Sequence, residues 1–284
     1  MYYLLILSIV AASLNSILLN KAQVKKKDEI LKFNLIGTLV WCGILFVING
    51  ATVNLTPQVI FWGVLYGLTQ SFFILFKTAA MSNGSVSVTT LIGNCSLLIS
   101  VFVSLMVWKE RTSFLDIIGL GLLVVSIFMC TYKKTNAQYS SKWKYYAVFF
   151  LIFAALVGIV FKAFGKTGNS DYCGDMMFVA AIVMAVCYFI SFLFSGGIKF
   201  NSETRKSSFW IYALFCGILS CVYNRLNIFL AGSIDAIIFF PAFNGGVILL
   251  SALLGVLLCK EKLTYIQKGG ILIGIGAICL IGIL

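Results

Sequence analysis

The chain has 284 residues, of which 61% are hydrophobic and only 11% are charged, and its formal net charge is +12. Soluble domains are about 45–50% apolar and about 25% charged, so the composition excludes an ordinary soluble protein and predicts an integral membrane protein. The basic excess does not indicate nucleic-acid binding, because most cations lie in short runs between apolar segments, where they anchor helices beside anionic lipid. With no histidine, and with cysteines scattered without a Cys-x-x-Cys pair, the sequence predicts no metal site and no cofactor.

Ten apolar segments are long enough to cross a bilayer, which takes about 20 residues of helix. In chain order they cover residues 2–20, 33–50, 57–80, 85–107, 114–131, 144–165, 174–195, 208–231, 236–258 and 265–284. The first segment lacks a preceding basic region and a following cleavage site, so it is interpreted as a retained span rather than a signal peptide. The intervals between the segments are too short for a soluble domain.

An internal repeat relates the two halves of the chain. Residues 108–113 read Trp-Lys-Glu-Arg-Thr-Ser and residues 259–264 read Cys-Lys-Glu-Lys-Leu-Thr, and each run leads into an apolar segment that contains a glycine, Gly119 or Gly270. The sequence therefore predicts two five-helix units, residues 1–134 and 143–284. Because five is odd, the second unit crosses the membrane in the opposite sense. The expected fold is an all-α membrane protein of ten transmembrane helices in two inverted five-helix repeats.

The charged residues near the repeated runs have structural interpretations. Ser113 with Asp116, and Thr264 with Gln267, have the spacing of capping boxes. Glu110 and Glu261 precede helix N-termini, where negative charge is favourable, and helix capping is favoured over catalysis for both. Lys162 and Lys166 are expected to pair across a loop with Asp171 and Asp175.

The ten-span layout, the duplication and the repeated Glu-Lys/Arg-x-Thr run before a glycine-containing span resemble the drug/metabolite transporter superfamily, and within it the EamA-type ten-helix branch. The resemblance covers the whole chain. It implies a basket of ten helices that alternates access to one central cavity, and it is nearly silent about the substrate.

The orientation in the membrane has two conflicting indications. Sixteen cations lie on the side reached after spans 1, 3, 5, 7 and 9, and the other side has only Lys109, Arg111, Lys162, Lys166 and Arg225. The positive-inside rule then places both termini outside. Members of the family commonly place both termini in the cytoplasm, so the orientation stays open.

Polar residues inside the spans are the candidates for solute binding, because such groups are costly in lipid and usually face the bundle interior. Asn94 and Asn244 lie at similar depth in repeat-equivalent spans, with interhelical packing as the alternative. Lys77 and Arg225 indicate an anionic or zwitterionic solute if they line the cavity, although both could instead extend to the interface. The full predicted set is Asn94, Asn244, Arg225, Lys77, Gln70, Asn224, Asn227, Tyr223 and Phe243.

Interrupted helices often mark the site in inverted-repeat transporters. Pro241 removes a backbone donor, and Gly245 and Gly246 loosen the turn that follows, so a helix break is expected in span 9. Gly93 is its counterpart in span 4.

These features predict a secondary transporter of a small polar metabolite, such as an amino acid, a nucleotide or a sugar phosphate, in a multi-pass plasma-membrane protein. A monomer is expected to suffice, with a dimer as the alternative. A channel or structural membrane subunit is the second hypothesis. An intramembrane lipid-modifying enzyme is the third, and it is disfavoured because no cluster of carboxylates or nucleophile–base pair lies at membrane depth.

Overall fold

The computed structural model describes residues 1–22, 27–49, 52–83, 89, 92–110, 112–131, 141–168, 170–194, 207–259 and 264–282. Within these ranges every regular element is a helix. The helices are α1 (Tyr2–Ala22), α2 (Lys27–Ile48), α3 (Pro57–Asn83), α5 (Ser96–Trp108), α6 (Phe114–Thr131), α7 (Ser141–Lys166), η1 (Ser170–Tyr172), α8 (Cys173–Phe194), α9 (Ser207–Ser233), α10 (Ala236–Cys259) and α11 (Tyr265–Gly282).

Seven of these helices are long and apolar enough to cross a membrane, and three shorter apolar ones cover Ile92–Trp108, Phe114–Cys130 and Tyr265–Ile281. Together they match the ten expected spans. The protein is therefore an all-helical membrane protein, as the composition predicts.

The two expected capping boxes are confirmed. The Ser113 backbone N–H donates to Asp116 Oδ2 over 2.8 Å at the start of α6. At the start of α11 the Thr264 N–H donates to Gln267 Oε1 over 3.0 Å, and the Gln267 N–H donates to Thr264 Oγ1 over 3.3 Å. Each box satisfies backbone donors that a helix N-terminus leaves free.

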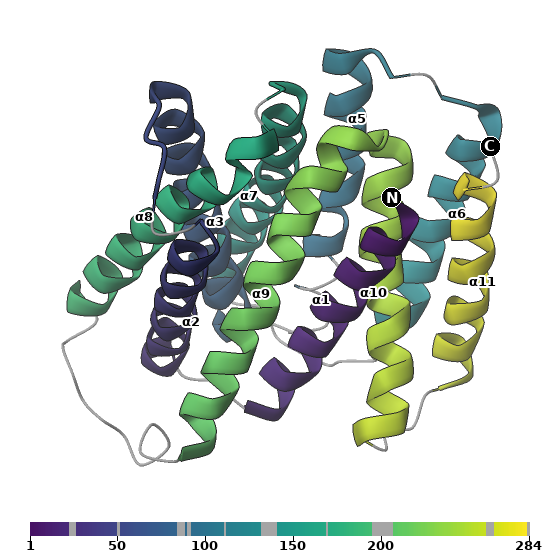
Figure 1. Ribbon diagram of the computed structural model, residues 1–284. Coiled ribbons are helices and arrows are strands. Elements are labelled where there is room, and N and C mark those ends of the chain that lie inside the picture. The colour runs from purple at the N-terminus through teal and green to yellow at the C-terminus, as the bar shows by residue number, and fades with distance from the viewer. Residues whose placement is uncertain are drawn as a thin grey trace.

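Both chain termini lie on one side of the bundle, shown towards the top of Figure 1. We call it the termini side; it also holds Lys109, Ser113 and the turn between α9 and α10. The opposite side holds the C-terminal ends of α1 and α3 and the N-terminal end of α5. We call it the basic side, because Lys21, Lys142 and Lys144 lie there.

The helices pack in pairs that cross between the two halves of the chain. α1 packs along α9 and α7 along α3, α2 packs on α8, and α6 packs on α11. In addition, α3 contacts α8, α2 contacts α9, α1 contacts α10, and α5 contacts α7. In lipid such helices associate through close packing and interhelical hydrogen bonds rather than through the hydrophobic effect.

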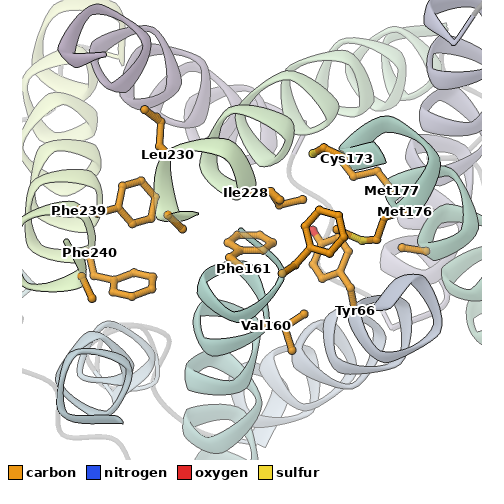
Figure 2. Close-up of a cluster of buried hydrophobic side chains, with 14 of the residues drawn as sticks. Tyr66, Val160, Phe161, Cys173, Met176, Met177, Ile228, Leu230, Phe239 and Phe240 are labelled. Atoms are coloured by element: carbon orange, nitrogen blue, oxygen red, sulfur yellow. The ribbon is translucent and has the colours of Figure 1, made fainter. Parts of the chain in front are cut away.

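A cluster of buried apolar side chains lies where α3, α7, α8 and α9 meet (Figure 2). Tyr66 is fully buried, its ring centroid is 5.2 Å from that of Phe161, and Met176 and Met177 are also fully buried. The Tyr66 hydroxyl donates to Asn224 Oδ1 over 3.1 Å. This cluster positions α9 against α3 and α7, and these three helices line the cavity described next.

Candidate solute-binding cavity

The fourth span changes helical geometry at Cys95. Residues 92–94 are helical, Cys95 forms a turn, and α5 continues from Ser96. The Cys95 N–H donates to the Ile92 carbonyl and the Leu98 N–H to the Cys95 carbonyl, each over 3.1 Å. In both bonds the acceptor lies three positions before the donor, as in a 3₁₀-helix, instead of four positions as in an α-helix. Such tightened turns often occur at functional positions. Asn94 lies directly before this turn.

A cavity of about 240 Å³ lies between α3, α5, α7, α9 and α10 and reaches Gly93 and Asn94. A second cavity of about 210 Å³ adjoins it and shares Gln70, Phe73, Lys77, Tyr223 and Asn224 with it. The second cavity is lined by the basic-side halves of α1, α2, α3, α8 and α9, so the combined space extends from the bundle interior towards the basic side.

Most of the sequence-predicted residues surround this space. Those that line the first cavity are Gln70, Lys77, Gly93, Asn94, Tyr223, Asn224, Asn227, Phe243 and Asn244. Because they come from α3, the fourth span, α9 and α10, the structure brings together side chains that are up to 174 residues apart in sequence, from Gln70 to Asn244.

Arg225 is not among the lining residues. It lies in a separate pocket on the termini side together with Asp171 and Cys173, and its carbonyl is 4.0 Å from Cys173 Sγ. Successive residues of an α-helix point about 100° apart, whereas residues three apart share a face. Asn224 and Asn227 therefore face the cavity while Arg225 faces away from it.

The expected break in span 9 is absent, because α10 continues from Ala236 to Cys259 with Pro241 inside it. Pro241 stands early in the helix and removes one backbone hydrogen bond without ending it. Gly245 and Gly246 act as packing positions, since a Cβ on either would lie 2.7 Å from a methyl carbon of Leu123 or Ile9. Only Gly93, of the four residues predicted at helix breaks, lies beside an interruption.

The polar side chains of the cavity differ in whether they have hydrogen-bond partners within the protein. Asn224 accepts from Tyr66 and donates to the Ser220 carbonyl over 2.8 Å, and Asn227 Oδ1 accepts from Ser8 Oγ over 2.6 Å. Both amides hold helices together. By contrast, Gln70 Oε1 is buried without a hydrogen-bond partner. A buried acceptor without a partner is costly, so it is the kind of group that a solute donor satisfies.

Lys77 is the cation of the cavity. Its ammonium lies 5.8 Å from the centroid of the Phe73 ring, and no carboxylate within the described ranges forms an ion pair with it. The lining residues of both cavities include no aspartate or glutamate. The space therefore combines a positive charge, the unpartnered Gln70 amide oxygen and aromatic walls, which suits a solute that carries an anionic group.

Sequence reasoning missed Asn15, which lines the second cavity and whose Oδ1 is buried without a hydrogen-bond partner. Asn34 and Thr38 of α2 line the same space. The signal was available for Asn15, because it is an amide within an otherwise apolar first span. It was weak, because a single amide in a span is also explained by helix packing.

The termini side is held by a buried ion pair that differs from the expected pairing. Lys162 Nζ is 2.5 Å from Glu110 Oε1, and the two side chains are 0% and 4% exposed. The expected pairing of Lys162 with Asp171 or Asp175 is wrong, and Asp175 instead accepts from Asn49 Nδ2 over 2.9 Å. Glu110 caps α10 rather than the helix that follows it in sequence, because its Oε2 accepts from the Ala236 N–H over 2.7 Å.

Comparison with known protein families finds a match to the first part of the chain. The first 132 residues match the model of the EamA-like transporter family, which confirms the resemblance to the drug/metabolite transporter superfamily. Members of that family are membrane transporters and not enzymes.

Among solved structures, 29 chains match. One of them, described only as "Crystal structure of protein", shares 12% identity over 99% of this chain and 96% of its own, with a TM-score of 0.77. That likeness shows the fold. No curated protein sequence matches the chain.

Proposed function

We propose that the protein is a secondary active transporter that moves a small anionic or zwitterionic metabolite, such as an amino acid, a nucleotide or a sugar phosphate, by alternating access. The observation that carries the proposal is the internal cavity, in which Lys77 lies without a carboxylate partner in the described part of the protein. An unpaired cation inside a bundle is costly unless water or an anion accompanies it. A bound carboxylate or phosphate supplies that anion.

The packing supports two inverted repeats, with residues 1–134 and 143–284 as the units. If the first helix of one unit corresponds to the first of the other, then α1–α9 and α7–α3 are the same contact seen twice, and so are α2–α9 and α8–α3. The contacts α2–α8, α5–α10 and α6–α11 join a helix to its own counterpart. Such reciprocal pairing is what a two-fold axis between the units produces.

The two sides of the bundle support a state that is closed on the termini side. The cavity extends towards the basic side, and the Glu110–Lys162 pair lies between it and the termini side. By the positive-inside rule the basic side faces the cytoplasm, which would put both termini outside the cell membrane. The family's usual orientation is the opposite.

The proposal is tested with purified protein in two steps. A thermal-shift screen of amino acids, nucleotides, sugar phosphates and quaternary amines first identifies a stabilising solute, since a ligand of the folded state raises the unfolding temperature. Counterflow of that labelled solute in proteoliposomes is then expected to saturate. Flux that rises linearly with concentration would indicate a channel, and the absence of both stabilisation and flux would contradict the proposal.

A further inference from the structure

We propose that Glu110 and Lys162 form the gate that closes the termini side of the cavity, while the cavity extends towards the basic side. The inference rests on the proposed transport function and assigns residues to one step of it. Neither residue lines the cavity, so both act by holding helices in position rather than by touching the solute.

The ion pair joins three separate segments of the chain. Glu110 follows α5 in the first half, Lys162 belongs to α7, and the turn Ile234–Asp235 precedes α10. Lys162 Nζ donates to the Ile234 carbonyl over 2.7 Å, and Glu110 Oε2 accepts from the Ala236 N–H over 2.7 Å. The Lys162 ammonium thus binds the α9–α10 turn to α7, and the Glu110 carboxylate binds the same turn to the first half of the chain.

The polarity of this network is fixed by the backbone. The carboxylate meets the N-terminus of α10, which attracts negative charge, and the ammonium meets a carbonyl at the end of α9, where positive charge is favourable. The near-complete burial of both side chains removes solvent screening. Separating α7 from the turn would leave a buried carboxylate or ammonium unpaired unless water enters, so opening and hydration of this side are coupled.

A glycine crossing next to the ion pair closes the same side. Gly165 of α7 and Gly232 of α9 pack backbone to backbone, since a Cβ on Gly232 would lie 2.6 Å from the Gly165 Cα and 2.7 Å from its carbonyl oxygen. Such small residues allow two helices to approach closely without a solvent gap. The gate therefore consists of a steric seal and an electrostatic clamp within one helical turn of each other.

Among the described helices of the basic side, the lysine and the glycine crossing have no counterparts. Counted from the helix ends, the position in α1 that corresponds to Lys162 is Leu18, and the positions that correspond to Gly165 and Gly232 are Lys21 and Ser82. α7 packs on α9, whereas no extensive contact joins α1 and α3 within the described helices.

Hydrogen–deuterium exchange of the protein in lipid nanodiscs tests whether Glu110 and Lys162 form this gate. Lys162→Met removes the cation and keeps an unbranched side chain that is one atom shorter. The expected result is at least about tenfold faster exchange in peptides from the termini-side ends of α7 and α9, with slower exchange in the basic-side ends of α1 and α3. The reciprocal change is the signature of a gate, because local fraying speeds exchange on the termini side alone.

Three further variants complete the test. Lys162→Arg is expected to keep the wild-type pattern, because it keeps the charge. Glu110→Gln with Lys162→Met leaves no buried lone charge, and it is expected to fold and to show the same reciprocal shift. Lys166→Met is the matched control, because it removes an exposed lysine one turn away, and it is expected to change nothing.

Several outcomes would contradict the proposal that Glu110 and Lys162 form the gate. They are unchanged exchange in Lys162→Met, faster exchange on the termini side without slower exchange on the basic side, an equal response in Lys166→Met, or failure of the double variant to fold. Failure of the transport proposal is a separate result, since it is read from counterflow in the wild-type protein. The exchange pattern still decides whether this pair holds the termini side closed.

Discussion

Gly165→Ala provides the sharpest prediction about packing. The added methyl group would meet the Gly232 Cα and would lie 2.6 Å from the Gly232 nitrogen and 3.2 Å from the Ile228 carbonyl oxygen. All three are backbone atoms, so no side-chain rotation relieves the clash, and α7 and α9 must separate by roughly 1 Å. Overpacking of this kind costs about 1–3 kcal/mol, and the rigid backbone favours the upper half of that range.

The gain in helix propensity opposes this cost. Replacing glycine by alanine inside a helix contributes about 1 kcal/mol, so the net destabilisation expected for Gly165→Ala is about 1–2 kcal/mol. Gly121→Ala in α6 is the control, because nothing lies within 4 Å of its Cβ position, and it is expected to be neutral or slightly stabilising. The assay is the unfolding temperature of each variant in the same detergent, followed by exchange at the termini-side ends of α7 and α9.

The expected order of unfolding temperatures is therefore Gly121→Ala at or above the wild type, and Gly165→Ala below it. Gly165→Ala is also expected to speed exchange on the termini side, since the seal no longer closes. A Gly165→Ala protein as stable as Gly121→Ala, with wild-type exchange, would refute the steric seal. The close approach of α7 and α9 would then have no role in closing this side.

Three predictions concern the cavity and the orientation. Lys77→Met should raise the KM for an anionic solute about tenfold or more, because a hydrogen bond to a charged group contributes about 1.5–3 kcal/mol, and an unchanged KM would place the anion elsewhere. Asn94→Ala and Asn244→Ala should each lower uptake. Arg225→Gln should keep uptake within about twofold of the wild type, because Arg225 lies outside the cavity. A larger loss in Arg225→Gln than in the two asparagine variants would place the site in the Arg225 pocket. A reporter that works only in the cytoplasm, fused to the C-terminus, should be silent if the basic side faces the cytoplasm, and activity of that reporter would support the family's usual orientation.

The helices were predictable from the sequence because their signals are local. Apolar length defines a span in lipid, and the boxes at Ser113 and Thr264 define two helix starts within four residues. Polarity inside an apolar span likewise identified Gln70, Lys77 and Asn94 as candidates for the cavity.

The failures share one physical cause, which is that they depend on contacts between distant segments. Whether Arg225 faces the cavity depends on how α9 is rotated against its neighbours, and local sequence does not fix that rotation. Glu110 caps a helix that starts 126 residues later, and nothing near Glu110 or Lys162 distinguishes this pairing from the nearer alternatives. Pro241 lies early enough in α10 for the surrounding packing to keep the helix continuous.

The α6–α11 pair has a practical consequence. Ser126 donates to the Gly270 carbonyl over 2.7 Å, and Gln267 reaches back to the Cys130 carbonyl over 3.3 Å, so the two helices form a tight unit. Within the described residues, this unit packs extensively on α10 alone and adds no side chain to either cavity. An antibody fragment or a fused scaffold attached to this flank would therefore enlarge the particle for electron cryo-microscopy while leaving the solute's route untouched.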